Sequence, residues 1–282
     1  MKDTKDNEIL RLAAFSDGAT GGNPAGVVVC EALPSEAEMQ RIATEVGYSE
    51  TAFAAPEEDG WRVRYFSPEA EVAFCGHATV ALGSVLATRD GEGVFPLTLN
   101  TGRITVEAYR EGDALQVTLT SPPTHSAPAD PELVEAALKL FGLAPTDLDP
   151  SLPPALAYAG NDHLILGLTE RTTLAEMRYD LAEGARLMQR HGLTTIDFVW
   201  IETPQRFHCR NAFAIGGVLE DPATGAAAAA FSGYLRDIGW PHGGAIDLVQ
   251  GEDMGATSLL HAEFDDIPGR GIRVSGTTRV ID

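Results

Sequence analysis

Two segments of this chain have the composition of buried helices, and they constrain the fold more than any other feature. The stretches "HATVALGSVLA", which begins at His77, and "GAAAAAFSGYL", which begins at Gly225, consist of small and apolar residues without a charged stripe. A helix that is apolar on every side is stable only where other elements surround it. The sequence therefore predicts two buried helices, each enclosed by strands.

The segments around both helices show the alternating pattern of short strands. Helices are predicted after Ser35, a plausible N-cap that precedes a stop at Gly47, and in "PELVEAALKLFG". A further helical stretch, "LAEMRYDLAEGARLMQRHG", is expected to be interrupted at Gly184. Most of the remaining chain is predicted to form strands joined by turns.

The order strand, turn, glycine and small-residue helix occurs twice, once at Cys75-Gly76-His77 and once from Glu220 to Ala226. We therefore predict an α+β protein of two similar halves, each a curved, barrel-like antiparallel sheet wrapped around a central helix. The predicted halves are residues 1–121 and 122–282. Whether the final strand packs on the first half stays open.

Composition excludes several classes of function. The net charge of -21 repels phosphate backbones, so no nucleic-acid partner is expected. No apolar run suits a membrane span and no secretory signal begins the chain, so we expect no membrane partner and a cytoplasmic location. The three cysteines and seven histidines are scattered, and no nucleotide-binding glycine motif occurs. We therefore predict no metal and no cofactor.

The start of a buried helix is a natural place for an anion. Its first backbone N–H groups have no helical partners, and the helix dipole makes this end partly positive. The turn Cys75-Gly76-His77 is predicted to lie where a small anionic ligand can be held. Such a site supplies the positive potential that the acidic surface lacks.

Four side chains are candidates for chemistry, and each also has an ordinary structural interpretation. His77 can donate a proton or simply bond a carbonyl, and Cys75 can be a reactive thiol or an inert core residue. Glu50, in "GYSETAFAA", has apolar neighbours that suit a proton shuttle, or it faces solvent. Asp221 can act in the site or cap the second helix. Cys30 and Cys209 are interpreted as structural.

At these residues the sequence resembles the PhzF family of phenazine biosynthesis. The motifs that carry the resemblance occur in order over nearly the whole chain: "GNPAGVVV", "MQRIATEVGYSETAF", "RYFSPEAEVAFCGHATVAL", "EDPATGAAAAAF" and "QGEDMGATSLL". The resemblance implies the diaminopimelate epimerase fold, with two similar halves and the active site between them. It also implies an isomerase that needs no metal or coenzyme, and commonly a homodimer.

The resemblance assigns roles to individual residues. It makes Glu50 the acid/base that moves a proton between carbons of the substrate, assisted by His77 and Asp221. Backbone groups at Gly76 and Gly225 would line the anion pocket. The best-known reaction of the family is isomerisation of trans-2,3-dihydro-3-hydroxyanthranilate.

Two departures from the family pattern concern the substrate. The family usually has T-G-S-A at the second helix, whereas this chain has Ala226 in place of the serine. The family's G-R-P-S is here Gly255-Ala256-Thr257-Ser258, which removes an arginine. The predicted substrate is therefore a small carboxylate other than the best-known one.

Two other functions are compatible with the sequence. A racemase that uses Cys75 as one of two bases needs a second base on the opposite face, usually a cysteine at the second helix start, and the stretch from Pro222 to Gly225 has none. A small-molecule-binding protein without turnover is the second alternative.

Overall fold

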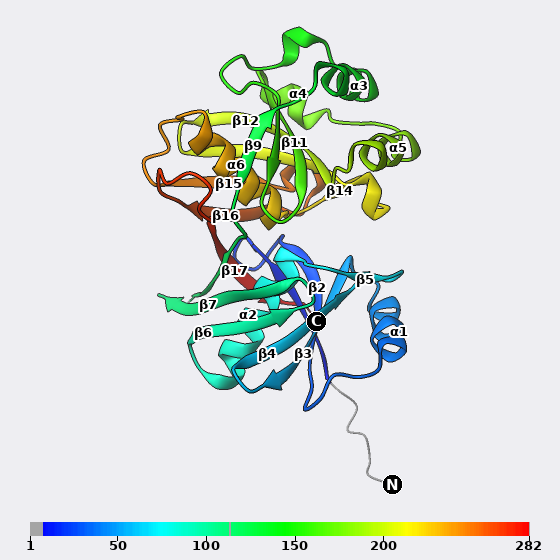
Figure 1. The fold of residues 1–282 in the computed structure, drawn as a ribbon, viewed down its shortest axis with the longest axis vertical. Helices are drawn as coiled ribbons and strands as arrows, with labels where there is room; N and C mark the ends of the chain where they lie inside the picture. Colours follow the sequence, from blue (N-terminus) through cyan, green and yellow to red (C-terminus); the bar gives the residue numbers. More distant parts are fainter. Residues whose placement is uncertain (1–7, 113, 282) are drawn as a thin grey trace. The chain divides into compact units, whose positions relative to one another are not determined.

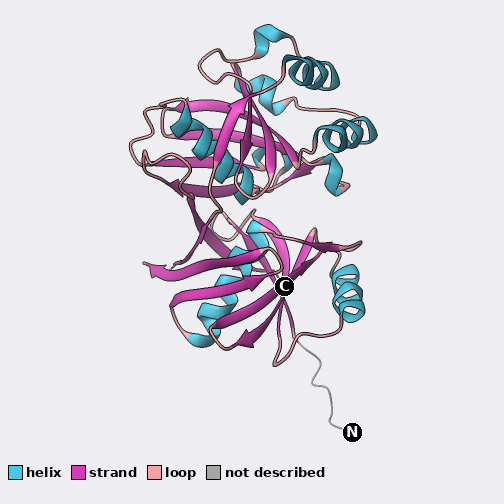
Figure 2. Cartoon of the chain, viewed as in Figure 1, coloured by secondary structure: helices cyan, strands magenta, loops and turns pink. Residues whose placement is uncertain are grey.

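The computed structural model describes residues 8–112 and 114–281, and the chain divides into two compact units. The first unit comprises Met1–Thr120 and Ser275–Asp282, and the second comprises Ser121–Val274. Each unit combines strands with helices (Figures 1 and 2). The division into two domains, residues 1–121 and 122–282, stays a prediction.

The strands of the first unit close into a ring. Going round, each strand pairs with the next and the last pairs with the first: β1 (Ile9–Ala14), β2 (Asn23–Val29), β3 (Glu50–Glu57), β4 (Gly60–Phe66), β6 (Gly93–Leu99), β7 (Gly102–Glu111), β8 (Ala114–Thr120) and β17 (Arg273–Val280). The pairs β2–β3 and β4–β6 are parallel. The final strand β17 pairs antiparallel with β1. The expected barrel-like sheet is therefore confirmed, with parallel pairs among the antiparallel ones.

Helix α2 (Gly76–Asp90) is the central helix of this barrel. Every residue from Gly76 to Ala87 is buried, and the helix packs against β1, β2, β3, β6, β7 and β8 (Figure 1). The surrounding strands approach this helix so closely that only small side chains fit at some of its positions. A Cβ placed on Gly83 would lie 2.7 Å from Val106 and 2.8 Å from Val117. The prediction of a buried helix enclosed by strands is confirmed here.

Helix α1 (Glu36–Val46) covers the outer side of the same sheet. Ser35 is its N-cap and accepts a hydrogen bond from the backbone of Glu38, and Gly47 ends it in the left-handed conformation at φ 71°. Its buried side chains join a cluster with β2, β3 and β4 that contains Val28, Met39, Ile42, Phe53 and Phe66.

The second unit repeats this plan. Its strands are β9 (His125–Pro128), β10 (Ala155–Tyr158), β11 (Asp162–Leu168), β12 (Thr195–Thr203), β13 (Arg206–Ala212), β15 (Ala245–Gln250) and β16 (Ser258–Glu263), each paired with the next. The pairs β11–β12 and β13–β15 are parallel, as β2–β3 and β4–β6 are in the first unit. Helix α6 (Gly225–Asp237) takes the place of α2 and is buried from Gly225 to Arg236.

The remaining elements are short or lie outside the sheets. Two-residue strands precede the central helices: β5 (Glu71–Val72) before α2 and β14 (Glu220–Asp221) before α6. The outer helices of the second unit are α3 (Pro131–Phe141), α4 (Arg171–Ala175) and α5 (Leu181–His191), and the 3-10 helices are Pro145–Asp147, Ala214–Gly216 and Glu252–Met254. Among the residues that the structure describes, no helix has the length and apolar character that crossing a bilayer requires.

The predicted interruption at Gly184 is wrong. Helix α4 ends at Ala175, and α5 begins at Leu181 after an N-cap, Asp180, that accepts a hydrogen bond from the backbone of Glu183. Gly184 lies inside α5 because the helix passes close to its neighbours there. A Cβ at this position would lie 2.4 Å from the Tyr179 ring.

Candidate active site

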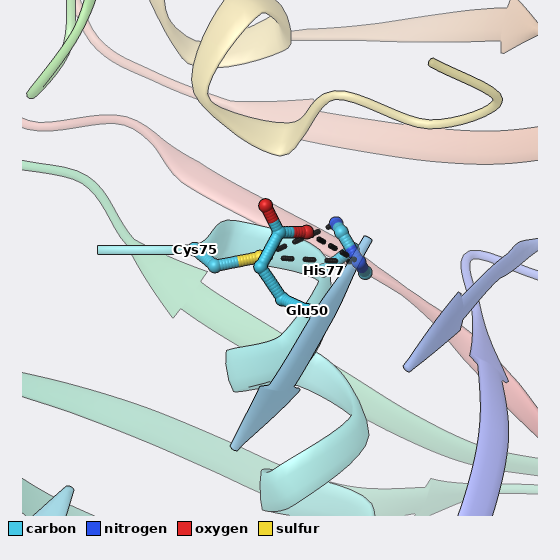
Figure 3. Close-up of side chains that lie close together, drawn as sticks. All are labelled: Glu50, Cys75 and His77. Carbon is cyan, nitrogen blue, oxygen red and sulfur yellow. Dashed lines mark hydrogen bonds and ion pairs between the residues drawn. The ribbon is translucent and has the colours of Figure 1, made fainter. Parts of the chain in front are cut away.

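Glu50, Cys75 and His77 converge at the start of the central helix of the first unit (Figure 3). Glu50 is the first residue of β3. Because side chains alternate along a strand, Glu50 shares a face with Ala52, and Phe53, which packs with α1, lies on the other face. Cys75 is the N-cap residue of α2, and His77 is in the first turn. The β3 strand and the α2 helix therefore fix the three side chains separately.

The imidazole of His77 lies between the other groups. Its Nε2 atom is 3.4 Å from Glu50 Oε2, 3.3 Å from Ser49 Oγ and 3.9 Å from Cys75 Sγ, while Nδ1 is 3.4 Å from the same sulfur. The exposed fractions are 8% for Glu50, 7% for Cys75 and 5% for His77. A buried carboxylate beside an imidazole is an arrangement that can take up and deliver a proton.

Hydrogen bonds inside the barrel fix the start of α2. The hydroxyl groups of Tyr65 and Thr79 are 2.6 Å apart, and Thr79 Oγ1 donates to the carbonyl of Cys75 at 2.7 Å. Burial raises the pKa of the Tyr65 phenol, so this group stays neutral. No side chain caps α2 and no acidic residue occurs in its first turn, which leaves its N-terminus suited to an anion.

The second unit presents a similar helix start with different side chains. Asp221 is buried in β14, and its Oδ2 atom accepts a hydrogen bond of 2.6 Å from Thr224 Oγ1. Thr224 is the N-cap residue of α6, so Asp221 lies outside the capping position that one interpretation gave it. As in α2, no side chain caps α6 and its first turn has no acidic residue.

Gln250 holds this helix start and was missed as a functional candidate in the sequence. Its Nε2 atom donates to the carbonyl of Asp221 at 2.7 Å and to Thr224 Oγ1 at 3.0 Å, and its Oε1 atom accepts from the backbone N–H of Thr224 at 3.0 Å. Gln250 is only 2% exposed. The signal for it was its place at the start of the "QGEDMG" motif, but the partner residues are distant in sequence.

The two helix starts occupy equivalent places in the repeat. Arg64 makes two hydrogen bonds to Glu71, the residue that opens β5, and Arg210 makes two to Glu220, the residue that opens β14. The strand registers agree, since Phe66 pairs with Glu71 as Ala212 pairs with Glu220. Residues the same number of positions after Glu71 and after Glu220 are therefore equivalent in the two units.

This correspondence shows that the two units differ in chemistry. Thr224 takes the position of Cys75, and Ala226 takes the position of His77. The registers of β12 with β13 and of β3 with β4 place Thr195 where the first unit has Glu50. Among the residues that the structure describes, the cluster of carboxylate, thiol and imidazole therefore occurs in the first unit and has no counterpart in the second.

A buried polar chain occupies the matching part of the second unit. Thr195 Oγ1 donates to Asn211 Oδ1 and lies 2.7 Å from His163 Nδ1, while Asn211 Nδ2 donates to Asp197 Oδ1 at 2.9 Å. Burial raises the pKa of Asp197 well above its usual range and lowers that of His163 to about 3. Both groups are therefore favoured in their neutral forms.

The structure thus brings three of the predicted site residues together. Glu50, Cys75 and His77 form one cluster, with Gly76 as the first residue of α2. The other predicted residues, Asp221, Gly225 and Ala226, lie at the start of α6 in the second unit. The catalytic and binding roles of all seven residues stay predictions.

Comparisons with known proteins identify the fold of this chain and the family to which it belongs. The structure resembles a PhzF-family phenazine biosynthesis protein from Bacillus anthracis, with a TM-score of 0.83 and 24% identity over 97% of this chain and 96% of that one. It also resembles a probable proline racemase from Agrobacterium radiobacter K84, with a TM-score of 0.66 and 13% identity over 97% and 90%. These two likenesses show the fold.

Residues 12–281 match the PhzC-PhzF family, described as phenazine biosynthesis-like protein, and the chain belongs to that family. Among curated relatives, an uncharacterised isomerase from Deinococcus radiodurans is 33% identical over 93% of this chain and 87% of its own length. The uncharacterised isomerase YddE of Escherichia coli K12 is 29% identical over 97% and 96%.

Proposed function

We propose that this chain is an isomerase that moves a proton between carbons of a small, carboxylate-bearing substrate, with Glu50 as the acid/base. The observation that carries this proposal is the burial of Glu50 beside His77 at the start of a buried helix. The membership of the family and the isomerase names of its relatives support the reaction class.

Each group at the start of α2 has a part in the proposed reaction. The carboxylate of Glu50 removes a proton from one carbon, and the resulting carboxylic acid returns a proton to another. His77, 3.4 Å from the carboxylate oxygen, orients Glu50 and stabilises negative charge on the substrate as it develops. The uncapped N–H groups from Gly76 onward bind the substrate carboxylate.

The repeat argues against the alternative of a racemase with two thiol bases. Such an enzyme needs a second thiol at the start of α6, and the residue equivalent to Cys75 there is Thr224. The Thr224 hydroxyl donates to the Asp221 carboxylate, but a hydroxyl is far less acidic than a thiol and does not replace a thiolate as the base near neutral pH. Proton transfer by Glu50 needs only one base.

The substrate is proposed to be a carboxylate other than trans-2,3-dihydro-3-hydroxyanthranilate. Ala226 has no hydroxyl group with which to bond a polar group of that compound. A buried polar group left without a partner costs about 1–3 kcal/mol, which disfavours that substrate. Asp221, whose carboxylate is held by Thr224, is proposed to assist in binding.

The experiment that tests this function uses the wild-type protein in deuterated water. A panel of small unsaturated and hydroxylated carboxylates is incubated with the protein, including trans-2,3-dihydro-3-hydroxyanthranilate. Proton and carbon magnetic resonance then report whether an isomer forms and whether deuterium is incorporated at carbon. An isomer that carries solvent deuterium at carbon supports the proposal, whereas binding of a panel member without any turnover supports the binding-protein alternative.

A further inference from the structure

We infer that Glu50, Cys75 and His77 form a binding site for a single zinc ion, and that zinc at this site inhibits the proposed isomerase. The three side chains supply a carboxylate oxygen, a thiolate sulfur and an imidazole nitrogen, all within 4.8 Å of one another (Figure 3). The inhibition rests on the proposed function, whereas the zinc binding rests on the geometry of the three side chains alone.

The distances between the ligand atoms fit tetrahedral zinc. With typical zinc–ligand bonds of about 2.0–2.3 Å, the tetrahedral angle places a nitrogen about 3.4 Å from an oxygen ligand and about 3.6 Å from a sulfur ligand. In the structure, His77 Nε2 is 3.4 Å from Glu50 Oε2 and 3.9 Å from Cys75 Sγ. The sulfur also lies 3.4 Å from Nδ1, on the other side of the ring, so binding of zinc through Nε2 requires the Cys75 side chain to rotate toward Glu50.

Charge and burial also favour a divalent cation. A thiolate and a carboxylate with a neutral imidazole balance the two positive charges of zinc, so the occupied site is neutral. Since all three residues are less than 10% exposed, this neutrality matters more than it would in water. The net charge of -21 adds a general attraction for cations.

The choice of zinc follows from the ligand types. Thiolate and imidazole ligands bind zinc and other transition metals well, whereas magnesium and calcium prefer sites made only of oxygen ligands. Three protein ligands leave the fourth position open. Zinc on His77 Nε2 would replace the hydrogen bond of 3.3 Å between this nitrogen and Ser49 Oγ. The metal would occupy the lone pair with which Glu50 accepts a proton, so bound zinc blocks the proposed base.

The repeat predicts that the chain binds one zinc ion in this way and not two. At the equivalent positions the second unit has Thr195, Thr224 and Ala226, and none of these is a thiolate, imidazole or carboxylate. The second unit thus serves as an internal control for the ligand set.

Binding is tested with metal-free protein in buffer without thiol reductant. Zinc is titrated by calorimetry, and cobalt(II) is added as a spectroscopic substitute that gives a thiolate-to-cobalt charge-transfer band. We expect one equivalent of zinc and a cobalt band that disappears in Cys75→Ala. Affinity should fall by more than about 10–100-fold in Cys75→Ala and His77→Ala, because loss of even an outer-shell partner costs that much. Cys30→Ala, which removes another buried thiol of the first unit, should behave as wild type.

The outcomes separate this inference from the proposed function. Circular dichroism confirms that each variant is folded before it is compared. A cobalt band that is absent from the wild type, or that persists unchanged in Cys75→Ala, overturns the zinc site. Isomerase activity that depends on Glu50 but is unaffected by one equivalent of zinc overturns inhibition and leaves the function standing. Stoichiometric zinc binding by a protein whose turnover does not depend on Glu50 overturns the function and leaves the site standing.

Discussion

Thr224 stands at the start of α6 where Cys75 stands at the start of α2, as the N-cap residue of a buried helix four residues after a glutamate paired with arginine. The two-fold repeat of the fold is therefore not a repeat of the chemistry. An enzyme that needs matching thiols at both helix starts cannot use this pair, whereas one that uses a single carboxylate can.

Replacing Cys75 by alanine should leave most of the activity. If Glu50 is the base, Cys75→Ala loses one contact to His77 and should lower kcat by no more than about tenfold, the value of one hydrogen bond. The kcat of Cys75→Ala is compared with that of Cys30→Ala, in which the thiol removed is also buried but packs with α1. A loss of about 100-fold or more in Cys75→Ala alone would instead favour the racemase mechanism.

Replacing Gln250 by leucine should weaken both stability and catalysis. The substitution leaves the partly buried backbone N–H of Thr224 and the buried carbonyl of Asp221 without the Gln250 amide, at a cost of about 1–3 kcal/mol in unfolding free energy. Urea denaturation measures this cost, and kcat/KM reports the effect on the site. Gln189→Leu, at an exposed position of α5, is the matched control and is expected to change stability by less than about 0.5 kcal/mol. Equal stability of the two variants would mean that Gln250 does not hold the helix start.

The Asp197→Asn variant should be less sensitive to alkaline pH than the wild type. Because burial raises the pKa of Asp197 in the folded state, its stabilising contribution is present below about pH 4 and is lost as pH rises toward the folded pKa. Asparagine has no such proton. The difference in unfolding free energy, variant minus wild type, should therefore rise by about 1.4 kcal/mol per pH unit from about pH 4 up to the folded pKa of Asp197, and should stay constant above it.

At acidic pH, the dependence of the unfolding free energy on pH reports the ionisation of His163. Its pKa is lowered to about 3 in the folded state, so its contribution is present above about pH 6.5 and is lost as pH falls toward 3. In the wild type this slope opposes that of Asp197 between about pH 4 and 6.5. Asp197→Asn should therefore lose stability on acidification in that window more steeply than the wild type. Parallel profiles of the two proteins from pH 4 to 8 would show that Asp197 is ionised in the fold.

Restoring a serine at Ala226 should improve turnover of trans-2,3-dihydro-3-hydroxyanthranilate. A hydroxyl that bonds a buried polar group of the substrate recovers about 1–3 kcal/mol, or roughly 5- to 150-fold in kcat/KM. Ala227→Ser places the same hydroxyl one residue further along α6 and is the control. Efficient wild-type turnover that Ala226→Ser does not improve would refute the proposed substrate preference and leave the reaction class intact.

Much of the fold could be predicted from the sequence because its main constraint is local. The absence of a charged stripe in the segments after His77 and Gly225 was enough to predict two buried helices, and Ser35 and Gly47 marked the ends of α1 correctly. The break near Gly184 was misplaced because a glycine can serve close packing inside a helix as well as end one. Only the position of Tyr179 in space distinguishes these cases.

The candidate site was predictable in its members but not in its contacts. The resemblance placed Glu50 and His77 in one site, yet neither it nor the spacing indicated that the Cys75 sulfur lies with both of them within 4.8 Å. Gln250 and Asp197 were missed because their importance depends on strand pairing between distant segments. The same pairing is needed to recognise that Thr195 is the counterpart of Glu50.

The most direct test of the account is the rate at which Glu50→Gln incorporates solvent deuterium into product, compared with Glu57→Gln. Both glutamates belong to β3, but Glu50 is buried at its start and Glu57 is exposed at its end. Loss of a general base costs about 10²–10⁴-fold, so Glu50→Gln should lose at least 100-fold in kcat while Glu57→Gln keeps the wild-type value. Deuterium incorporation by Glu50→Gln at a rate within a few-fold of wild type would contradict the assignment of Glu50 as the residue that moves the proton.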